Sequence, residues 1–142
     1  MKKVRELLDE KGTQVWSIAP TKSVYDALAL MAEKNIGAVL VMDEGQLVGL
    51  LAERDYTRKV ILKGRASKDT RVSDIMSSRP LCIGPEQTID ECMALMTEKR
   101  VRHLPVVKDN RVLGLISIGD VVKATIAEQQ FIIEQLGLYI SS

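Results

Sequence analysis

Apolar residues recur at helical spacing in two stretches of the chain. In each stretch they follow the i, i+3, i+4, i+7 pattern that places side chains on one face of an α-helix. The two stripes are Val24, Ala27, Leu28 and Met31, and Ile89, Cys92, Met93 and Met96. Ser23 and Thr88 stand immediately before them and are suitable N-caps. The pattern therefore predicts two amphipathic helices whose methionines fill a core.

Each predicted helix is followed by two apolar runs separated by a short polar break. The runs read AVLVM-DEG-QLVGLLA over 38–52 and LPVV-KDN-RVLGLIS over 104–117, which favours antiparallel hairpins. A short apolar segment precedes each helix, VWSI at 15–18 and PLCI at 80–83, and a second helix is expected after each hairpin, at 53–64 and 118–136. The predicted order is β-α-β-β-α, twice, which is an α+β fold.

The two halves of the chain are copies of one unit. When the sequence is shifted by 65 positions, residues 15–61 fall on 80–126 without a gap. The identical pairs include Ile18/Ile83, Pro20/Pro85, Met31/Met96, Gly49/Gly114 and Asp55/Asp120. A unit of about 50 residues buries little apolar surface alone, so we expect the two repeats to pack about a pseudo-twofold axis. The expected organisation is an N-terminal amphipathic helix at 1–12, a first repeat at 13–65, a linker at 66–79, a second repeat at 80–127 and a C-terminal helical extension at 128–142.

Composition and charge exclude several classes of function. The 142 residues carry a net charge of +1, which gives no electrostatic reason to expect a nucleic-acid partner. No apolar run approaches the roughly 20 residues that span a bilayer, and the N-terminus lacks the apolar segment of a secretory signal. We therefore expect a cytoplasmic protein with no membrane partner. Cys82 and Cys92 form no metal-binding pattern, so we expect two reduced thiols, buried or half-buried, and no metal site. With one histidine and no nucleophile–base pair, the chain is not expected to be an enzyme.

The tandem pattern resembles the cystathionine β-synthase (CBS) domain pair, also called a Bateman module. The resemblance rests on GLLAERD at 49–55 and GLISIGD at 114–120, on VRHLPVV at 101–107, and on Ile18-Ala19-Pro20 with Ile83-Gly84-Pro85 after the first strands. It covers residues 13–127 and is similar to small stand-alone bacterial members in which the pair is the whole protein. The resemblance implies a non-catalytic regulatory module that binds AMP, ATP, NAD or another adenosine-containing ligand in the cleft between the repeats. Such a ligand would be an effector and not a redox cofactor.

The chemistry of a nucleotide site can be placed on the last strand–helix junction of each repeat. Ser117 followed three residues later by Asp120 is a capping-box arrangement, and on a purely structural interpretation the pair only starts a helix. The same carboxylate has two acceptor oxygens for the hydroxyls of a ribose, and the helix N-terminus offers free N–H groups to a phosphate. The two roles are compatible.

The two expected sites are unequal. Asp55 is retained in the first repeat, but Ala52 replaces the hydroxyl residue, and Arg54 or, less clearly, Arg58 could compensate. Arg102 and His103 precede the second strand of repeat two, where the resemblance implies contacts to phosphate, and Arg102 is the better candidate because its charge is permanent. Their counterparts, Gly37 and Ala38, are small and uncharged. The resemblance also implies an adenine slot flanked by Ile18, Pro20, Ile83 and Pro85. Each of these residues has a plain alternative as core, turn or solvated surface.

The same substitutions leave a second interpretation open, in which the chain is a structural dimerisation or partner-docking module with degenerate ligand sites. Apolar stripes at the two ends bear on this question. They comprise Val4, Leu7 and Leu8 at the N-terminus, and Ile126, Phe131, Ile132 and Leu136 near the C-terminus. We expect them to form an interface and the protein to be a homodimer, with any effector protein acting in trans; the alternative is that both tails fold back over their own domain.

Overall fold

The structure is a computed structural model that describes residues 2–12 and 14–141. The chain forms two compact units. Of the described residues, the first-repeat unit holds 14–81 and 110–112, and the second-repeat unit holds 2–12, 82–109 and 113–141. Each unit is described by itself.

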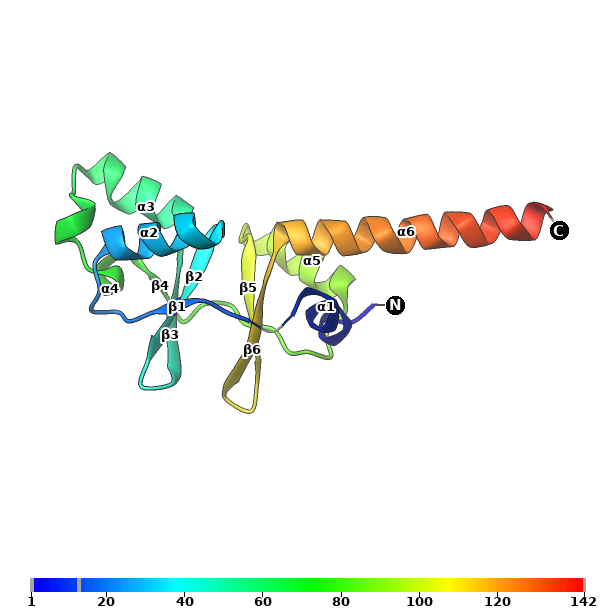
Figure 1. The fold of residues 1–142 in the computed structure, drawn as a ribbon, viewed down its shortest axis with the longest axis horizontal. Helices are drawn as coiled ribbons and strands as arrows, with labels where there is room; N and C mark the ends of the chain where they lie inside the picture. Colours follow the sequence, from blue (N-terminus) through cyan, green and yellow to red (C-terminus); the bar gives the residue numbers. More distant parts are fainter. Residues whose placement is uncertain (1, 13, 142) are drawn as a thin grey trace. The chain divides into compact units, whose positions relative to one another are not determined.

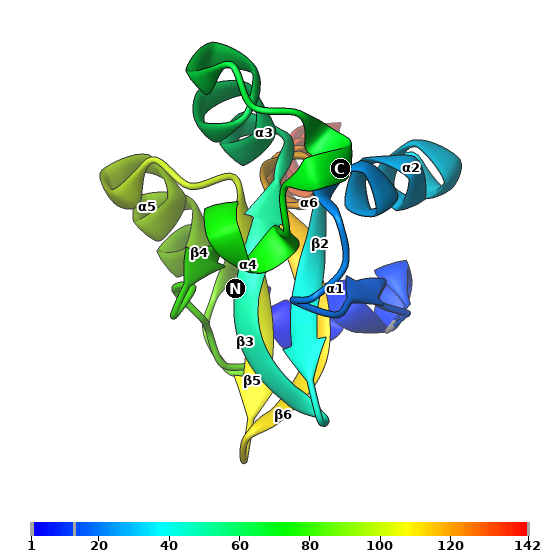
Figure 2. The same cartoon turned by 90° about the vertical axis from the view of Figure 1, so that its left-hand side faces the viewer.

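The first-repeat unit is a four-stranded sheet flanked by helices (Figure 2). Its strand order is β1-β2-β3-β4, with β1 parallel to β2 and the other neighbours antiparallel. The helices and strands are β1 (Ser17–Ile18), α2 (Val24–Lys34), β2 (Ala38–Asp43), β3 (Gln46–Ala52), α3 (Glu53–Lys59), α4 (Val72–Ile75) and β4 (Ser77–Ser78). The helix expected at 53–64 ends at Lys59 and is followed by a 3₁₀ turn, Ile61–Lys63. The predicted hairpin is confirmed as β2–β3.

The second-repeat unit repeats this plan with a shorter sheet. It contains α1 (Val4–Lys11), α5 (Ile89–Lys99), β5 (His103–Lys108), β6 (Arg111–Ser117) and α6 (Ile118–Ser141). The strand expected at 80–83 is reduced to a single parallel bridge between Ile83 and Val106. A proline explains the difference: in the first repeat the Leu40 N–H donates to the Trp16 carbonyl, whereas its counterpart Pro105 has no N–H to offer.

The helix predictions are confirmed at their caps and buried faces. The Ser23 hydroxyl accepts the Asp26 N–H at 3.1 Å, and the Thr88 hydroxyl accepts the Glu91 N–H at 3.1 Å. Glu91 completes a capping box by accepting the Thr88 N–H. The stripe residues at the core of the two units are Val24, Ala27 and Met31, and Ile89, Cys92 and Met96.

The helices that lead into the two repeats are exchanged between them. Helix α1 precedes the first repeat yet packs in the second-repeat unit, and α4 precedes the second repeat yet packs beside β3 and β4 in the first-repeat unit (Figure 1). The bridge from Lys3 to Thr88 corresponds to the bridge from Arg71 to Ser23. Three equivalent backbone hydrogen bonds of 2.8–3.0 Å accompany each bridge. At the Lys3 bridge, the N–H groups of Ile89, Val4 and Arg5 donate to the carbonyls of Lys2, Gln87 and Pro85, respectively. At the Arg71 bridge, the N–H groups of Val24, Val72 and Ser73 donate to the carbonyls of Thr70, Lys22 and Pro20.

This exchange overturns the expectation that the N-terminal apolar stripe is exposed. Val4, Leu7 and Leu8 are buried in the core of the second-repeat unit, against residues of α5, β5, β6 and α6. The expectation is wrong because α1 precedes the first repeat in the chain, whereas its packing partners lie in the second repeat. The N-terminal segment therefore belongs to a core and offers no free apolar face.

The glycine of the repeated Gly-Leu motif makes room for the exchanged helix. A Cβ at Gly114 would lie 2.6 Å from Leu8 Cδ2, and a Cβ at Gly49 would lie 2.5 Å from Met76 Sδ. Leu8 belongs to α1, and Met76 follows the last residue of α4. Both motifs thus keep glycine for the same reason, which is the close approach of the leading helix to the strand.

The C-terminal helix carries the apolar surface that the sequence predicts. α6 extends beyond the rest of its unit (Figure 1), and large apolar side chains from its third turn onward are exposed. They are Ile126, Phe131, Ile132, Ile133, Leu136, Leu138, Tyr139 and Ile140. In the described part of the chain, no helix combines the length and the hydropathy needed to cross a membrane.

The two cysteines differ in exposure, and the expectation that both are at least half-buried holds only for one. Both are free thiols; Cys92 is buried in the second-repeat core, whereas Cys82 is exposed beside the short bridge at Ile83. Burial, together with the negative charge of Glu91, raises the pKa of Cys92 to about 11. Cys92 is therefore a protonated core residue at neutral pH.

Candidate functional site

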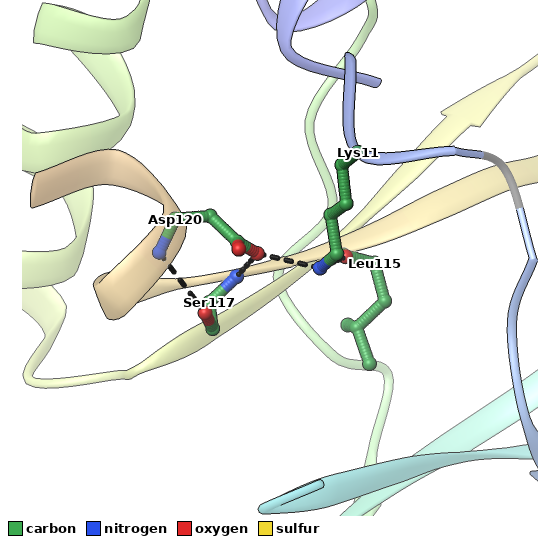
Figure 3. A network of polar contacts seen from close by, with 4 residues as sticks. All are labelled: Lys11, Leu115, Ser117 and Asp120. Atoms are coloured by element: carbon green, nitrogen blue, oxygen red, sulfur yellow. Dashed lines mark hydrogen bonds and ion pairs between the residues drawn. The ribbon is translucent and has the colours of Figure 1, made fainter. Parts of the chain in front are cut away.

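Asp120 and Ser117 form a reciprocal capping box at the start of α6 (Figure 3). The Ser117 N–H donates to Asp120 Oδ2 at 2.8 Å, and the Asp120 N–H donates to the Ser117 hydroxyl at 3.2 Å. These bonds orient the carboxylate at the junction where β6 ends and α6 begins. The Asp120 side chain nevertheless remains 25% exposed, so a ligand can reach it.

Asp55 makes half of the same arrangement in the first-repeat unit. Its Oδ2 accepts the Ala52 N–H at 2.9 Å, and Ala52 has no side-chain oxygen to return the bond. The Asp55 side chain is only 12% exposed, and Lys59 of the same helix lies 3.6 Å from Oδ1. The carboxylate in the first repeat is therefore less accessible than that of Asp120, which agrees with the expected inequality of the two junctions.

A lysine that the sequence analysis did not select lies at Asp120. Lys11, the last residue of α1, places Nζ 2.5 Å from Asp120 Oδ2 and 2.7 Å from the Leu115 carbonyl oxygen (Figure 3). Burial alone would raise the pKa of Asp120, but the hydrogen bonds from Lys11 and from the Ser117 N–H outweigh it and hold that pKa below its usual value. Asp120 is thus ionised and fixed at neutral pH.

His103 lies near this carboxylate, and Arg102 is joined to the same junction through its backbone. The Arg102 carbonyl accepts the Ile118 N–H at 2.8 Å, which ties the start of β5 to the first turn of α6. The Arg102 side chain is exposed and His103 is half-buried. Burial lowers the pKa of His103, Lys11 and Arg102 lower it further, and Asp120 opposes them. His103 is therefore neutral near pH 7 and offers a hydrogen bond, whereas Lys11 and Arg102 offer charge.

The corresponding junction of the first repeat has the same backbone but lacks these side chains. The Glu53 N–H donates to the Gly37 carbonyl at 3.1 Å, as Ile118 does to Arg102. Arg54 is half-buried in the first turn of α3, next to Asp55, and Arg58 is exposed one turn later. Arg54 and Arg58 are the basic side chains that the sequence analysis proposed for this junction.

The structure places the expected adenine-slot residues in turns and cores. Ile83 is buried in the second-repeat core, and its N–H and carbonyl are both used in pairing with β5. Ile18 is partly buried and packs against the first-repeat core. The carbonyls of Pro20 and Pro85 accept N–H groups of α4 and α1, respectively. These contacts account for all four residues structurally, and their contact with a base stays a prediction.

The shift of 65 positions does not reveal Lys11, because the two leading helices align with each other at a different shift. At a shift of 68, VRELLDEK over 4–11 aligns with VSDIMSSR over 72–79, so that Val4 matches Val72, Leu7 matches Ile75 and Lys11 matches Arg79. That alignment signals a leading helix in each repeat. Only the structure shows that the helix serves the opposite repeat. Among residues 2–12 and 14–141, no group of three or more His, Cys, Asp or Glu side chains is placed to hold a metal ion.

The fold and the junctions define a tandem-repeat α+β module in which each repeat ends on a helix-capping aspartate. The family model described as "CBS domain" matches residues 4–61 and 72–127, and the chain belongs to this family as a tandem CBS pair. Each match starts at a leading helix, α1 or α4.

Individual relatives support the assignment. The chain is 41% identical over 134 residues to the CBS domain-containing protein CBSX3, mitochondrial, of Arabidopsis thaliana, covering 91% of this chain and 65% of the relative. It is 49% identical to a solved structure of a protein with CBS domains from Burkholderia ambifaria MC40-6, with a TM-score of 0.87 and coverage of 90% and 96%. A structure of CBSX2 in complex with AMP is 26% identical, with a TM-score of 0.74 and coverage of 91% and 99%.

Proposed function

We propose that the chain is a non-catalytic regulatory module that binds an adenosine-containing nucleotide, AMP, ATP or NAD, as an effector. The observation that carries the proposal is the ionised, partly exposed Asp120 carboxylate paired with Lys11, at a strand–helix junction to which the backbone of Arg102 is hydrogen-bonded. The AMP complex of CBSX2, a relative with the same fold, supports it.

The roles of the second-repeat residues follow from their chemistry. Asp120 accepts the ribose hydroxyls, because an ionised carboxylate is an acceptor with two oxygens. The N-terminus of the 24-residue helix α6 supplies N–H groups and positive dipole to the phosphate, and Arg102 supplies a bidentate donor. His103 and Ser117 offer neutral hydrogen bonds at the same place. Asp55, with Arg54 and Arg58, is a second and weaker ribose–phosphate site.

Thermal unfolding with and without nucleotide tests the proposal. AMP, ATP or NAD at millimolar concentration should raise the Tm, since a ligand at 100 times its Kd adds about 2.7 kcal/mol to the free energy of unfolding. Asp120→Asn keeps an oxygen for the helix cap but removes the charge, and it should reduce the shift. Asp109→Asn, an exposed hairpin residue in the left-handed region, is the matched control. Equal Tm values with and without every nucleotide would contradict the proposal.

We further propose that the protein is a homodimer through α6. Val122, Ile126, Gln129, Ile133, Leu136 and Ile140 repeat at alternating intervals of four and three residues, which is the seam of a coiled coil. The apolar members of this stripe are exposed within the chain. A second copy of the same stripe covers it with like chemistry.

The alternative function, a dimerisation or docking module with degenerate ligand sites, is favoured by the same helix and by Ala52, Gly37 and Ala38 in the first repeat. It predicts self-association that does not depend on Asp55 or Asp120, and no nucleotide-dependent shift. The cytoplasmic location is likewise a proposal, to be tested by fractionation; the Arabidopsis relative is described as mitochondrial.

A further inference from the structure

The polar network at Asp120 contains one cation that helix capping does not require. The capping box is complete with Ser117 alone, and Asp55 caps α3 by accepting the Ala52 N–H. The cation near Asp55 is Lys59, from the same helix, and the residue equivalent to Lys59 in the second repeat is Ala124. Lys11 therefore forms an ion pair with Asp120 from another helix, whereas Lys59 forms an ion pair with Asp55 from the same helix.

The position of Lys11 is set by the core. Leu8, one turn before Lys11 on α1, is buried and lies against Gly114, and the next residue along β6 is Leu115, whose carbonyl accepts from Lys11 Nζ at 2.7 Å. The exchanged helix therefore holds the ammonium group at the end of β6. The side chain is 37% exposed, so the ammonium is reachable from solvent.

Lys11 and Asp120 each keep hydrogen-bonding capacity that a ligand can use. An ammonium group has three N–H donors, and the bonds to Asp120 Oδ2 and the Leu115 carbonyl use two of them. The bonds from Ser117 and Lys11 both fall on Oδ2 of Asp120. A ribose hydroxyl can therefore donate to Oδ1 while the third N–H of Lys11 meets an anionic oxygen of the same ligand.

We infer that Lys11 is a specificity-determining residue of the second-repeat site, and that it makes this site prefer adenosine ligands that carry a phosphate over the unphosphorylated nucleoside. The inference rests on the proposed function and deepens it. A nucleoside satisfies Asp120 but brings no anion to Lys11. A nucleotide adds a charge-assisted hydrogen bond, which changes affinity by about tenfold or more.

The test compares the Kd values of AMP and adenosine by calorimetry on the full chain, in an Asp55→Asn background so that the heat reports the second-repeat site. Lys11→Met keeps the aliphatic stem and removes the donors; it should weaken AMP about tenfold and leave adenosine unchanged or tighter. Lys11→Arg should keep the preference. Lys2→Met is the matched control, because Lys2 also forms a 2.8 Å ion pair, and its partner is Glu10.

Each outcome decides the inference. An unchanged ratio of the two Kd values in Lys11→Met, or equal weakening of both ligands, would overturn it while leaving nucleotide binding intact. Absence of binding of both ligands to the Lys11-containing protein would overturn the proposed function, and the inference with it. Far-UV circular dichroism checks that Lys11→Met is folded; should it unfold, Lys11→Gln gives the same comparison with a donor kept for the Leu115 carbonyl.

Discussion

Replacing Gly114 by alanine tests whether the leading helix is the reason for the glycine in the repeated motif. The new Cβ would lie 2.6 Å from Leu8 Cδ2 and 3.3 Å from Cδ1, so the whole isobutyl group must move. Leu8 is 4% exposed and has no solvent to move into. Overpacking of this kind costs about 1–3 kcal/mol, which exceeds the roughly 0.5–1 kcal/mol that alanine gains over glycine in a strand. We expect Gly114→Ala to lower the free energy of unfolding.

Urea denaturation at a fixed protein concentration measures this loss. Gly84→Ala is the control, because a Cβ at Gly84 meets nothing within 4 Å in the described structure, and it should change stability little. Leu8→Ala alone should cost about 2–5 kcal/mol, since it removes a buried leucine. In the double variant the clash is gone, so the combined loss should be smaller than the sum of the two by roughly 0.5–3 kcal/mol.

Two results would refute the reasoning. If Gly114→Ala is as stable as the wild type, the close approach of Leu8 does not limit this position. If the losses from Gly114→Ala and Leu8→Ala add, the two residues are independent, and the glycine is kept for another reason.

Two further predictions concern Asp120 and α6. The pKa of Asp120 is lowered in the folded state, so the stabilisation it brings is present above about pH 4 and is lost as the pH falls through the folded pKa. Lys11→Met should therefore differ more from wild type in free energy of unfolding at pH 7 than in acid below the folded pKa, and a difference that is constant with pH would contradict the pairing. Sedimentation equilibrium at tens of micromolar should show a dimer for the wild type and for Glu134→Lys, and a monomer for Ile133→Lys, because only Ile133 belongs to the apolar stripe; a monomeric wild type or a dimeric Ile133→Lys would exclude α6 as the interface.

Local patterns predicted most of the fold. The N-caps at Ser23 and Thr88, the buried helix stripes and the hairpins all depend on residues close together in the chain, and the 65-residue repeat predicted each element twice. The exchange of α1 and α4 could not be predicted in this way. A stripe such as Val4, Leu7 and Leu8 indicates that one face of a helix is buried, but it does not show which residues pack against that face. The reduced strand at Ile83 depended on a single missing N–H at Pro105.

For the candidate site too, the sequence predicted the residues of local motifs but not the contact made by a distant residue. Ser117 and Asp120 belong to one local motif, Arg102 and His103 belong to another, and the Ile118 N–H to Arg102 carbonyl bond joins the two in the second-repeat unit. Lys11 lies more than a hundred positions away along the chain from Asp120, and no spacing rule connects them. It reaches the site only because an exchanged helix carries it there.

The exchanged helices also decide when each half of the protein can be completed on the ribosome. Residues of the first-repeat unit are nearly contiguous, from 14 to 81, and its strands can pair early in synthesis. The second-repeat unit needs Val4, Leu7 and Leu8, which emerge before the first repeat, and Val121 and Ala124, which emerge after both hairpins. Its closing contacts are of very long sequence separation, which slows folding. Helix α1 therefore waits for its partners while both repeats are synthesised, and its apolar stripe is a segment that a chaperone would meet during that delay.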